Sequence, residues 1–192
     1  MVHASAVSAK TALRLVLRER RMALAAEIPD AGERAASLFS LDRASGVVVA
    51  AGYRPRGGEI NPRPLMQRLA QAGVMLALPV ALEREGPLAF RAYAPGDRLE
   101  PDACNIAAPT AQAPLVRPDL VITPLLAFDR RGGRMGQGGG HYDRTLEALR
   151  AEGAVFALGL AYAGQEVADI PLEPHDQRLD AILTEKGYIE IE

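Results

Sequence analysis

Hydrophobic positions along the chain fall into short apolar runs that alternate with amphipathic stretches. Runs of aliphatic residues bounded by Gly or Pro predict buried strands at Gly46–Ala50, Val74–Leu78, Leu120–Thr123, Val155–Leu160 and Ala181–Leu183. The segment Leu88–Tyr93 alternates apolar and polar residues, which predicts a half-exposed strand. Helical patterning predicts helices at Ser5–Ala26, Asp30–Leu41, Leu65–Ala72 and His141–Glu152.

Two segments lack such a pattern. Tyr53–Pro64 is rich in Pro, Gly and Arg and predicts a loop. Pro95–Pro118 contains five prolines and little periodicity, so we expect a long irregular loop there. We also expect Pro79 to end the strand that precedes it.

The alternation of helices with all-apolar strands predicts an α/β fold. We expect a single domain over residues 1–192, a three-layer α/β/α arrangement with a mostly parallel sheet covered on both faces. Ligands of such folds gather at the carboxyl ends of the strands. The loops after Ala50, Leu78 and Thr123 are therefore the first candidates for a site.

Composition narrows the class of protein. About half of the residues are hydrophobic, the formal net charge is −2, and Cys104 is the only cysteine. These values exclude an intrachain disulfide and a thiolate metal cage, and they favour neither a nucleic-acid nor a membrane partner. The first residues lack the apolar core of a signal peptide, and no apolar run approaches the roughly 20 residues that span a bilayer. We expect a cytoplasmic protein, in which any anion site must come from a local cluster of cations.

The segment from Arg130 to Arg144 has the residues for such a site. A predicted strand leads into a loop with six glycines, and a predicted helix begins near His141. Glycine lets backbone amides approach a ligand, a helix N-terminus attracts anions, and four arginines add full charges. The spacing matches neither a Walker A motif nor a Rossmann fingerprint. The alternative to a phosphate cradle is a mobile surface loop whose glycines serve turns.

Two further features allow two interpretations each. Asp143, in the first turn of the predicted helix, is either a favourable charge at the helix dipole or a ligand for magnesium. Lys10, Arg14, Arg18 and Arg21 fall within about 80° of one another on the first helix. They form either a solvated cationic face or a contact with phosphates.

The segment Phe128–Asp143 reads FDRRGGRMGQGGGHYD and resembles the signature F-D-x-x-G-x-R-x-G-x-G-x-G-x-Y-D of the 5-formyltetrahydrofolate cyclo-ligase family, also called 5,10-methenyltetrahydrofolate synthetase. Other segments typical of the family occur in the family's order along nearly the whole chain. They are the Lys10 and Arg14 pair, Glu59 in its loop, Leu78-Pro79, and Ile170–Asp180. The chain departs from the family at His141, where many members have Tyr, and at Gln137, where some have Arg or Tyr.

The resemblance implies roles for individual residues. Contacts with ATP are implied for Lys10, Arg14, Arg134, Met135, Gly136, Gln137, Gly138, Gly139, Gly140, His141 and Tyr142. Contacts with the folate are implied for Glu59, Arg54 and His141, and contacts with magnesium for Asp143 and Asp176, with Asp180 as a weaker candidate. The residues expected to act in catalysis are Arg134, Tyr142 and Lys10.

The implied reaction is the ATP- and Mg²⁺-dependent conversion of 5-formyltetrahydrofolate to 5,10-methenyltetrahydrofolate, with release of ADP and phosphate. The implied partners are a reduced folate and ATP, with no nucleic acid and no membrane, and we expect a monomer. Two alternatives stay open: another ATP-dependent enzyme of small molecules, and a non-catalytic nucleotide- or RNA-binding paralogue on the same fold. Near-neutral charge and only nine aromatic residues argue against an RNA surface.

Overall fold

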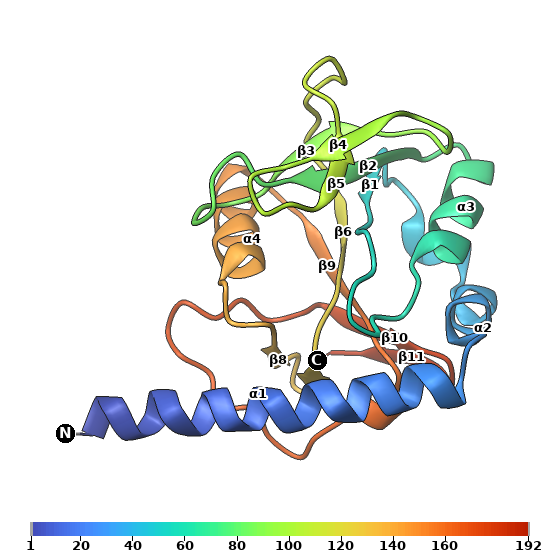
Figure 1. Ribbon diagram of the computed structural model, residues 1–192. Coiled ribbons are helices and arrows are strands. Elements are labelled where there is room, and N and C mark those ends of the chain that lie inside the picture. Colours follow the sequence, from blue (N-terminus) through green and yellow to red (C-terminus); the bar gives the residue numbers. More distant parts are fainter. Residues whose placement is uncertain (1, 192) are drawn as a thin grey trace.

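The computed structural model describes residues 2–191, with side chains from residue 10 onward. Its centre is a seven-stranded sheet in the order β11-β10-β9-β6-β1-β2-β3 (Figure 1). The five inner strands are parallel, and the edge strands β3 and β11 are antiparallel to their neighbours. The strands are β1 (Val49–Ala51), β2 (Met75–Val80), β3 (Ala89–Ala92), β6 (Leu120–Thr123), β9 (Phe156–Leu160), β10 (Ala181–Thr184) and β11 (Gly187–Glu190).

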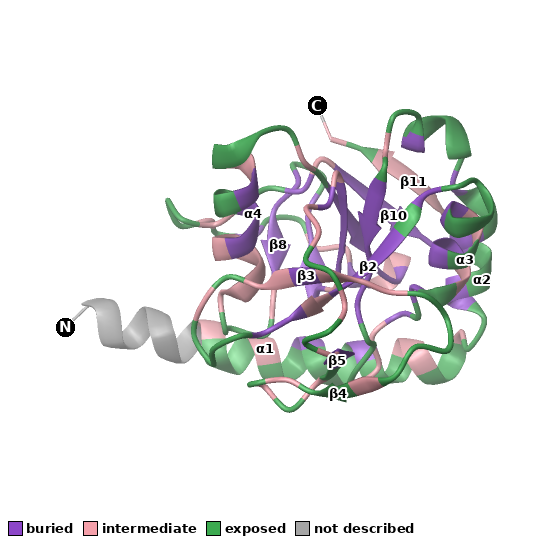
Figure 2. Ribbon diagram, turned by 90° about the horizontal axis from the view of Figure 1, so that it is seen from above, coloured by how far each residue is buried: buried purple, intermediate pink, exposed green. Residues whose placement is uncertain are grey.

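Helices cover both faces of this sheet. On one face α2 (Ala31–Leu38) and α3 (Arg63–Gln71) bury side chains such as Ala35 and Leu69 against the strands. On the other face α4 (His141–Glu152) buries Leu146 and Leu149. The inner strands are mostly buried between these two cores, and the edge strands β3 and β11 are more exposed (Figure 2). The prediction of a three-layer α/β/α fold with a mostly parallel sheet is confirmed.

The longest helix, α1 (Val2–Glu27), lies across the end of the sheet where β1, β6 and β9 terminate (Figure 1). Leu17 is buried there, and Leu24 packs on Gly164 of the 3-10 helix η2 (Ala163–Gln165), which follows β9. A Cβ atom at position 164 would lie 2.7 Å from a methyl carbon of Leu24, so this glycine permits the close approach of the helix.

The segment Pro95–Pro118 differs from the prediction. It contains a hairpin of β4 (Leu99–Pro101) and β5 (Ala107–Pro109), which is fastened to the end of β2 by hydrogen bonds between Ala81 and the hairpin turn. The prediction of an irregular loop was wrong because Pro101 and Pro109 stand at the ends of their strands, where a missing backbone N–H costs little.

Two boundaries and a small hairpin also differ. The strand β2 continues through Pro79 to Val80, since beyond Ala77 it pairs with β3 alone. The second helix ends at Leu38 and is followed by a 3-10 helix, η1 (Leu41–Ala44). The short hairpin of β7 (Ala127–Phe128) and β8 (Arg134–Met135) has too few residues to produce a periodic pattern.

None of the described helices combines the length and apolar character that crossing a membrane requires.

Candidate active site

A cavity of about 920 Å³ lies at the carboxyl ends of the strands. Its walls are α1, the glycine-rich loop with the start of α4, the loop between β1 and α3, the turn of the β4–β5 hairpin, and residues 170–176. All fifteen residues that the sequence assigned to a site line it: Lys10, Arg14, Arg54, Glu59, Arg134, Met135, Gly136, Gln137, Gly138, Gly139, Gly140, His141, Tyr142, Asp143 and Asp176.

The cavity is locally cationic although the chain as a whole is slightly acidic. Seven Lys or Arg side chains line it against five from Asp or Glu. The chain has a formal net charge of −2, so this excess of cations is local. A concave cationic surface concentrates anionic ligands. The cavity is therefore suited to a polyanion such as a nucleotide.

The cations of α1 contact different loops in succession. Lys10 Nζ pairs with Glu173 Oε1 at 2.7 Å, and Arg14 Nε donates to the Gly136 carbonyl oxygen at 3.2 Å. One turn further, Arg18 Nε donates to Gln137 Oε1 at 2.7 Å. The cationic face of α1 therefore contacts other loops of the protein and is not merely solvated. The exposed pair of Lys10 with Glu173 contributes little to stability, so a phosphate could replace it.

The glycine-rich loop ends directly at the N-terminus of α4. Gly140 is the N-cap residue with φ +65°, and Gly138 has φ +103° with the Arg14 guanidinium alongside. Both conformations favour glycine strongly. The amides of the first turn of α4 begin at His141, and the loop residues and this turn all line the cavity. Loop amides and the positive end of the helix dipole together form an anion-binding surface.

The signature residue Asp129 shapes the start of this loop and lies outside the cavity wall. The buried carboxylate accepts hydrogen bonds from the backbone N–H groups of Arg131, Gly133 and Ile170, each at 2.9 Å. Burial alone would raise the pKa of Asp129, but these three N–H donors hold it below the usual value. The residue therefore fixes the turn that precedes β8.

Arg134 and Asp143 form a partly buried ion pair. Arg134 Nη2 donates to Asp143 Oδ1 at 2.6 Å, and their side chains are 3% and 20% exposed. The backbone N–H of Gln177 donates to the same oxygen at 3.0 Å. Arg134 Nη1 is buried and has no hydrogen-bond partner within residues 2–191. Buried donors are nearly always paired, so an anionic oxygen in the cavity would complete this site.

The two metal candidates line the same part of the cavity. Asp176 Oδ2 accepts a hydrogen bond from Glu173 N at 2.7 Å, and Gln177 links the segment to Asp143. Asp180 instead binds Arg150 and the Ala157 N–H. No group of three or more His, Cys, Asp or Glu suited to a metal occurs in the described part of the chain. Since Mg²⁺ commonly uses one or two carboxylates with substrate phosphates, the donor set fits a shared ion and not a protein-only cage.

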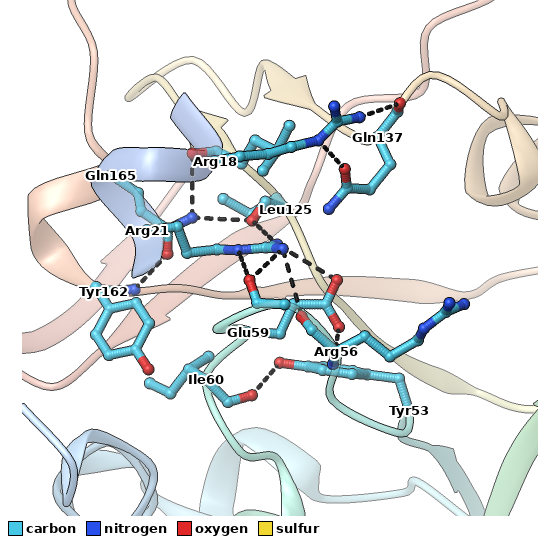
Figure 3. Close-up of polar contacts among 12 residues, drawn as sticks. Arg18, Arg21, Tyr53, Arg56, Glu59, Ile60, Leu125, Gln137, Tyr162 and Gln165 are labelled. Carbon is cyan, nitrogen blue, oxygen red and sulfur yellow. Dashed lines mark hydrogen bonds and ion pairs between the residues drawn. The ribbon is translucent and has the colours of Figure 1, made fainter. Parts of the chain in front are cut away.

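Glu59 lines the cavity from the loop between β1 and α3. Its Oε1 pairs with Arg21 Nη1 at 3.3 Å, and its Oε2 accepts the Arg56 N–H at 2.9 Å (Figure 3). Burial raises the pKa of the Glu59 carboxyl, and Arg21 opposes that rise. Tyr53 stiffens the same loop by donating from its hydroxyl to the Ile60 carbonyl oxygen at 2.5 Å.

His141 and Tyr142 lie where the loop meets α4. His141 Nδ1 is 2.9 Å from the Gly86 carbonyl oxygen, which can only accept, so Nδ1 carries the proton in the neutral ring. Its Nε2 then faces Cys104 Sγ at 3.8 Å as an acceptor. Burial raises the pKa of the Tyr142 phenol far above neutrality, so it remains a hydrogen-bond donor.

Sequence reasoning missed part of this wall. Tyr53, Asp102, Cys104 and Ile106 line the cavity, the last three from the hairpin that was expected to be irregular. Arg21 shares the helical face of Lys10, but it is not among the residues to which the resemblance assigns a role. That shared face was the available signal, but no pattern in the sequence indicated that Arg21 is buried.

Comparison with known proteins identifies the family. A model of the 5-formyltetrahydrofolate cyclo-ligase family matches residues 6–185. The 5-formyltetrahydrofolate cyclo-ligase of Escherichia coli (strain K12) is 34% identical over 88% of this chain and 96% of its own. That of Mycolicibacterium smegmatis is 35% identical over 76% of this chain and 77% of its own.

A solved structure agrees with this similarity. The NMR structure of Aquifex aeolicus 5,10-methenyltetrahydrofolate synthetase has a TM-score of 0.78 and 27% identity, and it covers 95% of this chain and 93% of its own. The expectations of family membership and of an enzyme are confirmed. The chain belongs to the 5-formyltetrahydrofolate cyclo-ligase family.

Proposed function

We propose that this protein converts 5-formyltetrahydrofolate and ATP to 5,10-methenyltetrahydrofolate, ADP and phosphate. The observation that carries the proposal is a single cavity in which the cationic face of α1, the glycine-rich loop and the buried Glu59 carboxylate come together. Family membership supports the same reaction.

The nucleotide half of the cavity would be formed by α1 and the glycine-rich loop. Lys10 and Arg14 supply positive charge from α1. The loop from Met135 to Tyr142 supplies amides and the positive end of α4. Arg134 Nη1, which has no hydrogen-bond partner among the described residues, would neutralise an oxygen of the transferring phosphoryl group. Phosphoryl transfer depends mainly on such positioning and neutralisation, which this set of residues can provide.

Asp143 and Asp176 would hold a magnesium ion together with phosphate oxygens. Bound there, the ion would neutralise phosphate charge and orient the nucleotide. Asp143 has a second carboxylate oxygen besides the Oδ1 that receives Arg134 and the Gln177 N–H, so one side chain can serve both partners.

The folate half would be formed by Glu59, Arg54 and His141. An ionised Glu59 can accept hydrogen bonds from N–H groups of the pterin. The exposed Arg54 suits the anionic part of the folate, and His141 would contact both substrates from the cavity wall.

The chemical step starts from an unreactive formyl group. The γ-phosphoryl group passes from ATP to the formyl oxygen and ADP leaves. The N10 amine of the same folate then attacks the formyl carbon, N10 loses its proton, and phosphate departs with the former formyl oxygen. Ring closure is intramolecular, so fixing the folate supplies much of the rate. The step requires no protein nucleophile.

We further expect the enzyme to act as a monomer, because the residues assigned to both substrates come from one chain. A cytoplasmic location stays a prediction from the sequence. The expectation that no nucleic acid or membrane is involved also stays a prediction.

The test mixes purified protein with ATP, Mg²⁺ and 5-formyltetrahydrofolate and follows the near-ultraviolet absorbance of the methenyl product. We expect product formation that stops when either ATP or the folate is omitted. Absence of product at high enzyme concentration would reject the proposal. ATP binding without turnover would favour the non-catalytic paralogue, and turnover of ATP with another substrate would favour a different enzyme.

A further inference from the structure

Arg21 is the most deeply buried charged side chain that lines the cavity, at 2% exposure. Its Nε and Nη2 donate to the Gly57 carbonyl oxygen at 3.1 and 2.9 Å, and Nη2 also reaches the Arg56 carbonyl at 3.4 Å. Its Nη1 donates to the Leu125 carbonyl at 3.1 Å and to Glu59 Oε1 at 3.3 Å (Figure 3).

These five contacts join three parts of the chain. Arg21 belongs to α1, Leu125 follows β6, and Gly57 and Glu59 belong to residues 53–60, which we call the Glu59 loop. The other hydrogen bonds of the Glu59 loop among the described residues are internal, such as Arg56 N to Glu59 and Tyr53 to Ile60. Its Tyr53 and Ile60 side chains also pack in the hydrophobic core. The guanidinium is therefore a link from this loop to both the helix and the sheet.

The position of Arg21 is not explained by stability alone. Burial of a guanidinium is unfavourable and lowers the pKa of Arg21, and only one carboxylate compensates it. An arginine in such surroundings, beside the carboxylate assigned to the folate, has a directional role. The planar fork of five N–H donors can hold a carboxylate and several carbonyls at fixed angles, which the point charge of lysine cannot do.

We propose that Arg21 is the positioning residue of the folate half: it fixes the direction of the Glu59 carboxylate and fastens the Glu59 loop to α1. The inference rests on the proposed function, which assigns Glu59 to the folate. Because Lys10 and Arg14 project from the same helix, the fastening also holds the Glu59 loop in a fixed relation to the nucleotide half.

The test compares Arg21→Lys with Arg20→Lys, a matched control because Arg20 is the exposed neighbour on the same helix. Dissociation constants for 5-formyltetrahydrofolate and for ATP are measured separately by calorimetry. We expect Arg21→Lys to weaken folate binding by about tenfold or more. Its ATP binding, and both affinities of Arg20→Lys, should stay within about twofold of the unmodified protein.

A merely structural defect would lower the number of active sites and leave the folate dissociation constant unchanged. An unchanged folate affinity in Arg21→Lys overturns the proposal, and so does an equal weakening of both ligands. Methenyl product formation by the unmodified protein, measured on the same preparation, tests the proposed function independently.

Hydrogen–deuterium exchange of the ligand-free protein tests the positioning even if the unmodified protein binds no folate. Amides of the Glu59 loop should exchange faster in Arg21→Lys than in Arg20→Lys, and equal rates overturn the proposal. If Arg21→Lys does not fold, Glu59→Gln replaces it. In that variant Arg21 keeps its carbonyl partners, so folate binding should weaken while loop exchange stays near that of the unmodified protein; a freed loop overturns the proposal.

Discussion

At the scale of single residues, Asp143 has two partners and one expected ligand. It faces the buried Arg134 guanidinium and the Gln177 N–H, and the proposed function adds a magnesium ion. From the sequence alone, we would predict that removing the charge of Asp143 reduces turnover far more than it reduces stability. The ion pair changes this, because without Asp143 the positive charge of Arg134 would be buried without compensation.

We therefore predict that Asp143→Asn lowers the free energy of unfolding by about 2 kcal/mol, whereas Asp176→Asn lowers it by less than about 1 kcal/mol. Both variants should reduce kcat by about a hundredfold and raise the Mg²⁺ concentration for half-maximal activity. Urea unfolding and a Mg²⁺ titration measure the two effects. An unchanged Mg²⁺ requirement in both variants would mean that the metal assignment is wrong.

Glu59 gives a prediction about pH. Burial raises the pKa of the Glu59 carboxyl, whereas Arg21 and the Arg56 N–H favour its ionised form. A carboxyl with a raised pKa is ionised above that value and gains a proton below it. Folate affinity that depends on the carboxylate should therefore be constant at higher pH and fall as the pH drops through the raised pKa.

The measurement is the folate dissociation constant from about pH 8 to about pH 5, with Glu59→Gln as the control. The folate's own carboxyl groups titrate equally in both proteins, so only the difference reports on Glu59. We expect Glu59→Gln to bind more weakly than the unmodified protein at high pH and to lose the acid-dependent decrease. The same pH dependence in both proteins would argue against a contact of Glu59 with the folate.

At the scale of elements, the glycine-rich loop depends on the backbone conformation of particular glycines. Gly138 has φ +103°, and a Cβ atom there would lie 3.3 Å from the Arg14 guanidinium carbon. Gly136 lies in the same loop without a positive φ, and a Cβ atom there would meet nothing within 4 Å in the described structure. The two glycines form a matched pair.

Gly138→Ala should destabilise the protein by about 1–2 kcal/mol, because a left-handed backbone is unfavourable for alanine. Gly136→Ala should change stability by less than about 0.5 kcal/mol. Chemical unfolding of both variants measures the difference. Equal stabilities would show that the loop adopts another backbone conformation in solution than the one described here.

At the scale of the whole molecule, the sequence predicts the layers better than the connections. The apolar strands of the parallel sheet and the helices α3 and α4 could be predicted because burial on both faces and helical periodicity leave strong patterns. The β4–β5 hairpin and the continuation of β2 through Pro79 could not be predicted. Proline usually indicates the end of a strand, but a strand that pairs on one side only can continue through it.

The resemblance to the family could indicate which residues share a cavity, but not how their side chains pair, and the roles it implies for them stay predictions. All fifteen predicted residues line one cavity. The ion pair of Arg134 with Asp143, the burial of Arg21 beside Glu59 and the contribution of Cys104 depend on contacts between distant segments. Such contacts leave no local pattern in one sequence.

The most direct test of the central claim follows the formyl oxygen. 5-Formyltetrahydrofolate labelled with a heavy oxygen isotope in its formyl group is converted with ATP and Mg²⁺, and the phosphate released is analysed by mass spectrometry. Phosphoryl transfer to that oxygen predicts one labelled oxygen in each phosphate formed. Unlabelled phosphate, or no methenyl product, would contradict the account.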